Sequence, residues 1–167
     1  MANICDVRMR IASKSKQSII DFALGCRDRD FRVYNGIFTL DEDVDESKII
    51  EENGAFAYDC AFGCAWSFVT AFEEDGVNAM FGDPKPSHRE YLHELCAKRG
   101  VGVEAYSEEP GCCFEEHYLI SPSGEILISD CVEMHEVEDD SSETGWRKVG
   151  GFGDPDFMSP REILGAE

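Results

Sequence analysis

Residues 4–25 read ICDVRMRIASKSKQSIIDFALG, and this stretch decides the fold because it predicts a strand followed by a helix. Polar and apolar residues alternate over residues 4–11, which is the period-two pattern of a half-buried strand. Ser13 or Ser15 can then cap a helix by accepting a backbone N–H bond, and Gly25 can end it. We therefore expect a strand at residues 4–11 and a helix at about residues 16–24.

Similar patterns occur in the middle of the chain. Residues 55–62 and 64–72 are two aromatic-rich runs, which predict adjacent antiparallel strands. Ser87 begins a capping-box pattern, in which the cap and a glutamate three positions later satisfy each other's backbone N–H groups. This pattern predicts a helix at residues 88–98, and the alternation that follows predicts a strand at residues 101–106.

The order of these elements predicts a fold class. Taking an acidic segment at about residues 26–54 as an insertion, the chain has two β-α-β units whose helices cover one face of an antiparallel sheet. This is the α+β, ferredoxin-like split β-α-β sandwich, and residues 114–120 and 125–134 add a hairpin to it. We expect one such domain at residues 1–135 and an acidic, glycine-rich extension at residues 136–167.

The formal charge of −20 is unevenly distributed along the 167 residues. The first 40 residues carry an excess of three positive charges, and the other 127 carry an excess of 23 negative charges. Such a field repels nucleic acid and anionic membranes and favours basic partners. We therefore expect a protein partner, with basic proteins favoured, and neither a nucleic-acid nor a membrane partner.

The sequence also predicts in which cellular compartment the protein lies and whether it needs a cofactor to fold. The N-terminus does not resemble a signal peptide, and no apolar run approaches the ~20 residues needed to cross a bilayer. The eight cysteines are interpreted as reduced thiols, because a chain with 11 Phe can build a packed core without disulfides. We expect a cytoplasmic protein that folds without a cofactor.

Four short runs carry a family resemblance: MANIC at residues 1–5, CAWS at 64–67, SEEPG at 107–111 and FEEHY at 114–118. In this order they resemble the YubB or Api92-like proteins, which are small bacterial, plasmid and phage proteins with a ferredoxin-like domain. The resemblance implies that fold and a bacterial or mobile-element origin. The family's activity is unknown, so the resemblance implies no catalytic residue.

One cluster mixes a thiol, carboxylates and an imidazole, as nucleophilic and metal sites do; it comprises Cys112, Cys113, Glu115, Glu116 and His117. A nucleophilic Cys113 or Cys131 with His117 or His135 as its base is one hypothesis. A metal site would need a further ligand from elsewhere in the chain. The alternative is that these side chains only pack and form hydrogen bonds within the fold. We favour this alternative because acidic surroundings oppose the thiolate form of a cysteine.

We therefore predict a binding protein and not an enzyme, with the face around residues 108–118 as its recognition surface. Two alternatives stay open. One is a small Cys/His-dependent or metal-dependent enzyme, and the other is an acidic mimic of DNA that uses the acidic runs at residues 41–46 and 133–143. No metal ligand or catalytic residue is assigned. The predicted binding residues are Trp66, Glu109, Phe114, Glu116, His117 and Tyr118.

Overall fold

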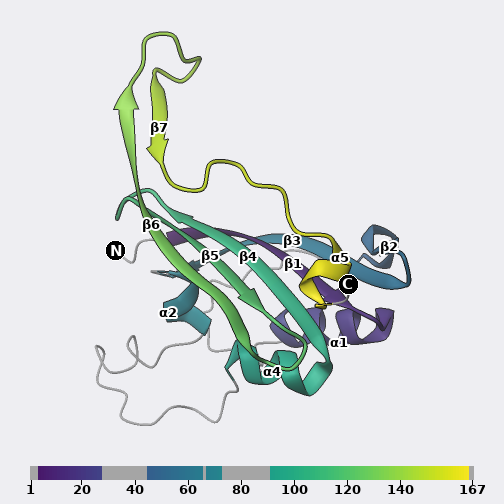
Figure 1. Ribbon diagram of the computed structural model, residues 1–167. Helices are drawn as coiled ribbons and strands as arrows, with labels where there is room; N and C mark the ends of the chain where they lie inside the picture. The colour runs from purple at the N-terminus through teal and green to yellow at the C-terminus, as the bar shows by residue number, and fades with distance from the viewer. Residues whose placement is uncertain (1–3, 28–44, 66, 73–90, 166–167) are drawn as a thin grey trace, which may run out of the picture.

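The computed structural model describes residues 4–27, 45–65, 67–72 and 91–165 (Figure 1). Within these ranges the strands are β1 (Ile4–Ser13), β2 (Ile50–Glu52), β3 (Ala55–Ala65), β4 (Val101–Glu109), β5 (Phe114–Ile120), β6 (Ile126–Glu138) and β7 (Trp146–Gly150). They form one sheet in the order β2-β3-β1-β4-β5-β6-β7, and each neighbouring pair is antiparallel. The sheet curls into a half-barrel.

Short helices complete the described part of the chain. They are α1 (Lys16–Arg27), α2 (Phe68–Phe72), α4 (Leu92–Arg99), α5 (Pro160–Ile163) and a 3-10 helix, η2 (Glu46–Lys48). Local capping explains two of them. The Oγ of Ser15 accepts the N–H of Ser18 at the start of α1, and Gly100 ends α4 in the left-handed conformation at φ +64°. Within these ranges, no helix combines the length and apolar character that a membrane span requires.

The main core lies between the sheet and the helices α1, α2 and α4 (Figure 1). Alternation in β1 directs Val7, Met9 and Ile11 to this side, where each is at most 2% exposed. Aromatic rings fill the space near α2: the Phe68 ring lies 4.8 Å from that of Phe72 and 5.5 Å from that of Tyr118. Burial of each such side chain contributes ~1.5–3 kcal/mol relative to its exposure.

The opposite face of the sheet carries a second apolar cluster and the C-terminal segment. Ala12, Leu119 and Ile163 are buried together there, and α5 packs against β1, β3 and β4. Gly102 permits this approach, because a Cβ atom at that position would lie 2.7 Å from Cγ2 of Ile163. The chain between β7 and α5 crosses this face, and Arg10 holds it by donating from Nη1 to the carbonyl oxygen of Met158 at 2.9 Å.

The prediction of a ferredoxin-like sandwich is wrong. A β-α-β unit joins two parallel strands through a crossover helix. In the structure β1 pairs with β3 and with β4, and both pairings are antiparallel. The sheet then continues through β5, β6 and β7, so the described chain is mostly sheet, with only short helices.

The predicted strand at residues 64–72 is also wrong. β3 continues without a break through Gly63 to Ala65, and α2 begins at Phe68. The reason is a tertiary contact, because the carboxylate of Glu116 accepts the Phe68 N–H at 2.7 Å.

The hairpin predicted at residues 114–120 and 125–134 is present as β5 and β6, but β6 continues to Glu138 and pairs with β7. The predicted extension at residues 136–167 therefore contains a strand, β7, and a helix, α5. The expected insertion at residues 26–54 lies largely outside the described residues, as does the Ser87 cap; residues 45–54 contain η2 and β2.

Candidate functional site

Alternation along β5 divides the predicted binding residues between the two faces of the sheet. Phe114, Glu116 and Tyr118 point toward the helices, whereas His117 points to the face crossed by the C-terminal segment. The predicted residues therefore do not form one surface. Trp66, the remaining member in mid-chain, lies outside the described residues.

Three of the predicted residues have structural contacts on or beside the helix-covered face. Glu116 is 5% exposed and accepts hydrogen bonds from the Ser107 hydroxyl at 2.6 Å and from the Phe68 N–H at 2.7 Å. Tyr118 is 2% exposed and packs against Phe68. Glu109 is also buried, and its carboxylate accepts the Cys112 N–H, which closes the turn between β4 and β5.

His117 belongs to a polar cluster on the opposite face. Its Nε2 lies 3.0 Å from Oε1 of Glu104, whose side chain is completely buried. The Tyr106 hydroxyl donates to the same oxygen at 3.1 Å, and the Met158 N–H donates to the other oxygen at 2.7 Å. The rings of Tyr106 and His117 stack with centroids 4.2 Å apart, and Phe152 meets the edge of His117 at 5.8 Å. Burial, with the charge of Glu104, raises the pKa of Tyr106 to about 12.

A pocket of about 440 Å³ lies beside this cluster, between the sheet and residues 152–155. Gly151 allows the chain to enter this path: it adopts φ +71°, and a Cβ there would collide with the carboxylate of Glu115. The lining comes from β1, β3, β4, β5 and the C-terminal segment. Its members are Asp6, Val7, Arg8, Ala61, Phe62, Gly63, Tyr106, Ser107, Glu108, Glu115, Glu116, Phe152, Gly153 and Pro155.

Three carboxylates form a row across this pocket. Asp6 on β1 lies directly opposite Glu108 on β4, and Glu108 lies directly opposite Glu115 on β5. Like charges in directly opposite positions of a sheet are destabilising. The row therefore concentrates negative charge on one side of the pocket, at a cost that its cationic neighbours reduce.

Two cations are already held at the pocket. Lys148 lies 2.7 Å from Glu108 and also contacts Glu115. Burial alone would lower the pKa of Lys148, but its hydrogen bonds to these carboxylates outweigh that effect and raise it. Arg8 pairs with Asp154 at 2.9 Å and lies 5.8 Å from the centroid of the Tyr106 ring.

The remaining charge at the pocket is negative. Among the described residues no cation pairs with Asp6. Counting Asp154 with its partner Arg8, four carboxylates face two cations on this side of the sheet, an excess of two negative charges; the acids are Asp6, Glu108, Glu115 and Asp154.

The structure does not join a thiol to His117. Cys131 lies opposite Glu116 in the β5–β6 ladder, so its side chain points to the face away from His117. Burial and the charge of Glu116 raise the pKa of the Cys131 thiol, which opposes its use as a nucleophile. Cys113 directs its Sγ to the carbonyl oxygen of Pro110 at 3.5 Å. Over the part of the chain that the structure describes, no group of three or more His, Cys, Asp or Glu side chains could hold a metal ion.

Sequence reasoning missed Asp6, Glu104 and Lys148 as site residues. The alternation of residues 101–106 did place Glu104 and Tyr106 together on one side of a strand. What it lacked was any signal for the neighbouring strand or for the segment that covers that side. Lys148 comes from β7, a strand that we did not predict.

Comparison of the chain with protein families, with curated proteins and with solved structures finds no match. The resemblance to the YubB or Api92-like proteins therefore stays a prediction from the sequence.

Proposed function

We propose that this chain is a binding protein for a basic partner protein, and that the pocket beside residues 152–155 receives a lysine or arginine side chain of that partner. The observation that carries this proposal is the row of carboxylates formed by Asp6, Glu108 and Glu115 across three neighbouring strands. Lys148 reduces the repulsion between Glu108 and Glu115. A cation beside Asp6 would in the same way reduce the repulsion between Asp6 and Glu108.

The aromatic lining suits the same ligand. Phe152 lines the pocket, and a cation over an aromatic face gains ~0.5–2 kcal/mol; the Tyr106 ring also lines it but is already stacked on His117. The chain's own Arg8 already uses Tyr106 in this way. The volume of about 440 Å³ falls within the ~300–1,000 Å³ typical of ligand pockets, which leaves room for a cationic group and its alkyl stem.

The charge of the whole chain supports a basic partner over a neutral one. A formal charge of −20 attracts a positively charged protein over distances of about a Debye length, ~8–10 Å at physiological salt. Such attraction accelerates association more than it adds affinity, and it suppresses binding of acidic proteins. The pocket would then select one basic side chain from the arriving surface.

The test uses three short peptides that are otherwise uncharged and contain one arginine, one lysine or one norleucine. Each is titrated into the protein, and the amide chemical shifts of the protein are followed. We expect shifts around Asp6, Glu108 and Phe152 with the two basic peptides and none with the norleucine peptide. Replacement of Asp6 with asparagine should weaken binding several-fold. The matched control is Glu51→Gln, which removes one exposed carboxylate on β2.

Three results would contradict the proposal. These are equal binding of the norleucine peptide, binding that Asp6→Asn leaves unchanged, and shifts confined to residues outside the pocket. Binding of a free alkylammonium ion that equals binding of the lysine peptide would instead identify a small organic cation as the ligand.

A further inference from the structure

A second surface lies on the hairpin formed by β7 and the end of β6, which projects from the body of the molecule (Figure 1). β7 is the last strand in the sheet, and among the described residues it pairs only with β6. An unpaired strand edge presents backbone N–H and C=O groups to which another extended chain can add. Trp146 on β7 is 49% exposed and Val149 is 40% exposed.

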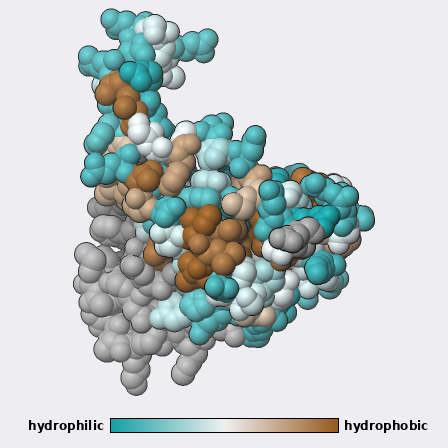
Figure 2. Space-filling model, viewed as in Figure 1, coloured by the Kyte–Doolittle hydropathy of each residue, from teal (hydrophilic) through white to brown (hydrophobic). Residues whose placement is uncertain are grey.

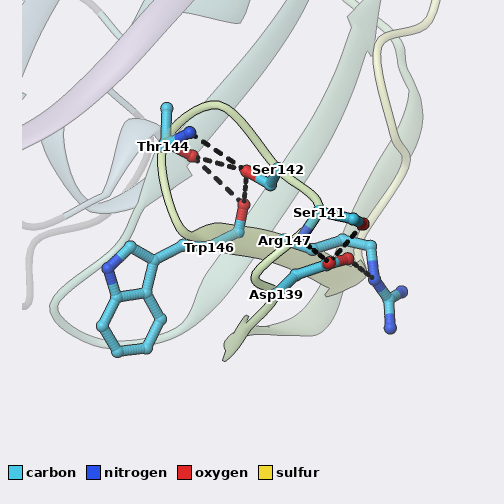
Figure 3. Close-up of polar contacts among 6 residues, drawn as sticks. All are labelled: Asp139, Ser141, Ser142, Thr144, Trp146 and Arg147. Carbon is cyan, nitrogen blue, oxygen red and sulfur yellow. Dashed lines mark hydrogen bonds and ion pairs between the residues drawn. The ribbon is translucent and has the colours of Figure 1, made fainter.

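Polar contacts at the tip hold this hairpin in one conformation (Figure 3). The carboxylate of Asp139 accepts the Ser141 N–H at 3.0 Å and Nε of Arg147 at 3.1 Å. The hydroxyl of Ser142 donates to the carbonyl oxygen of Trp146 at 2.7 Å. Figure 3 shows that the indole ring of Trp146 extends away from these contacts, so the ring is presented on a turn that is already ordered.

The hairpin is also strongly acidic. Residues 133–149 contain six Asp or Glu and two Lys or Arg, an excess of four negative charges. Both basic residues are engaged, Arg147 with Asp139 and Lys148 with Glu108. Figure 2 shows mostly hydrophilic residues over the outer part of the hairpin, with one hydrophobic patch on it. Glu138 lies directly opposite Trp146, which places a carboxylate beside the indole ring.

We propose that this hairpin is a second docking surface, on which an extended, lysine- or arginine-rich segment of a protein pairs with the edge of β7 beyond the Trp146 carbonyl oxygen, which Ser142 and Thr144 already occupy. The segment's basic side chains would lie against Trp146 and Glu138, which combine cation–π and charge attraction. A second copy of this chain is a poor occupant, because each hairpin carries the same excess of negative charge. The surface is separate from the pocket, since Trp146 and Glu138 do not line it.

The test measures binding of a short fluorescent peptide in which lysine and valine alternate. Two further peptides are a copy N-methylated at alternate residues, which cannot complete a strand ladder, and a copy with glutamate in place of lysine. We expect only the first peptide to bind, with an affinity that falls as salt rises. Because the pocket proposed above also takes a lysine side chain, the three affinities are measured in an Asp6→Asn background, in which that pocket is impaired, so failure here and failure of the proposed function are distinguishable.

The decisive variant is Trp146→Ala, which should weaken binding about tenfold or more because exposed aromatic residues commonly anchor interfaces. Its matched control is Leu127→Ala, a truncation of an exposed apolar residue at the other end of β6, which should have no effect. A second variant, Glu138→Gln, should reduce both the affinity and its salt dependence. The proposal is overturned if Trp146→Ala and Glu138→Gln leave the affinity unchanged, if the N-methylated or glutamate peptide binds equally well, or if sedimentation shows a dimer that Trp146→Ala dissociates.

Discussion

His117 contacts Glu104 diagonally across the β4–β5 ladder, with 3.0 Å between Nε2 and Oε1. The same carboxylate accepts the N–H of Met158, so it joins the sheet to the C-terminal segment. The polar cluster therefore helps to position the C-terminal segment, whose residues 152–155 form one wall of the pocket.

Replacement of Glu104 with alanine should destabilise the protein by about 3 kcal/mol. The change leaves the Met158 N–H and the Tyr106 hydroxyl without their acceptor, and each unsatisfied buried group costs ~1–3 kcal/mol. Urea unfolding measures the effect. Glu143→Ala, at an exposed site on the hairpin tip, should change the free energy of unfolding by less than about 0.5 kcal/mol. Equal effects of the two variants would disprove the structural role of Glu104.

Replacement of Glu116 with alanine should cost about 2 kcal/mol, because it removes the acceptor for the Phe68 N–H and for the Ser107 hydroxyl. The change at the start of α2 is a more specific test than the change in the global free energy of unfolding. Hydrogen exchange of the Phe68 amide should accelerate more than the variant's global loss of stability explains. Glu133→Ala, whose side chain is 91% exposed, is the control. An unchanged Phe68 amide would show that Glu116 does not hold the start of α2.

Replacement of Gly102 with alanine should loosen α5, because the new Cβ would lie 2.7 Å from Cγ2 of Ile163. We expect a cost of about 1–3 kcal/mol and faster proteolysis of the C-terminal segment. Combining it with Ile163→Ala removes the clashing methyl group, so the two costs should not add. Strict additivity of the two variants would contradict the close contact between Gly102 and α5.

Stability should fall as the pH rises from about 10 to about 12. Burial raises the pKa of Tyr106 from its usual 10.0 to about 12, aided by the charge of Glu104. The unfolded chain then releases its proton at a lower pH than the folded chain, so the tyrosine's contribution is complete below pH ~10 and is lost as the pH passes its folded pKa.

Tyr106→Phe provides the measurement for this pH dependence. The variant should show a shallower fall in the free energy of unfolding over the same pH range, and its tyrosinate absorbance should lack a group that titrates near pH 12. Identical pH profiles for the variant and the wild type would contradict the raised pKa.

Local patterns predicted those elements whose stabilising contacts are local. The strand predicted at residues 4–11 and the helix predicted after Ser15 are present as β1 and α1, because alternation and capping act between near neighbours, but β1 extends to Ser13 and α1 passes Gly25, its expected end, and reaches Arg27. The strand prediction for residues 64–72 failed, because Glu116, which accepts the N–H of Phe68 at the start of α2, lies 48 positions away in the sequence. Aromatic residues favour strands, and the local pattern carries no signal for this contact.

The sequence by itself determined that the chain is acidic and that polar and apolar residues alternate along β1 and the first part of β4. Only the tertiary structure decided that β1, β4 and β5 pair antiparallel in a register that aligns Asp6, Glu108 and Glu115. Alternation specifies which face a side chain occupies, but it contains no information about which strand lies beside it. The register and the covering segment arise from long-range packing, and they create the pocket.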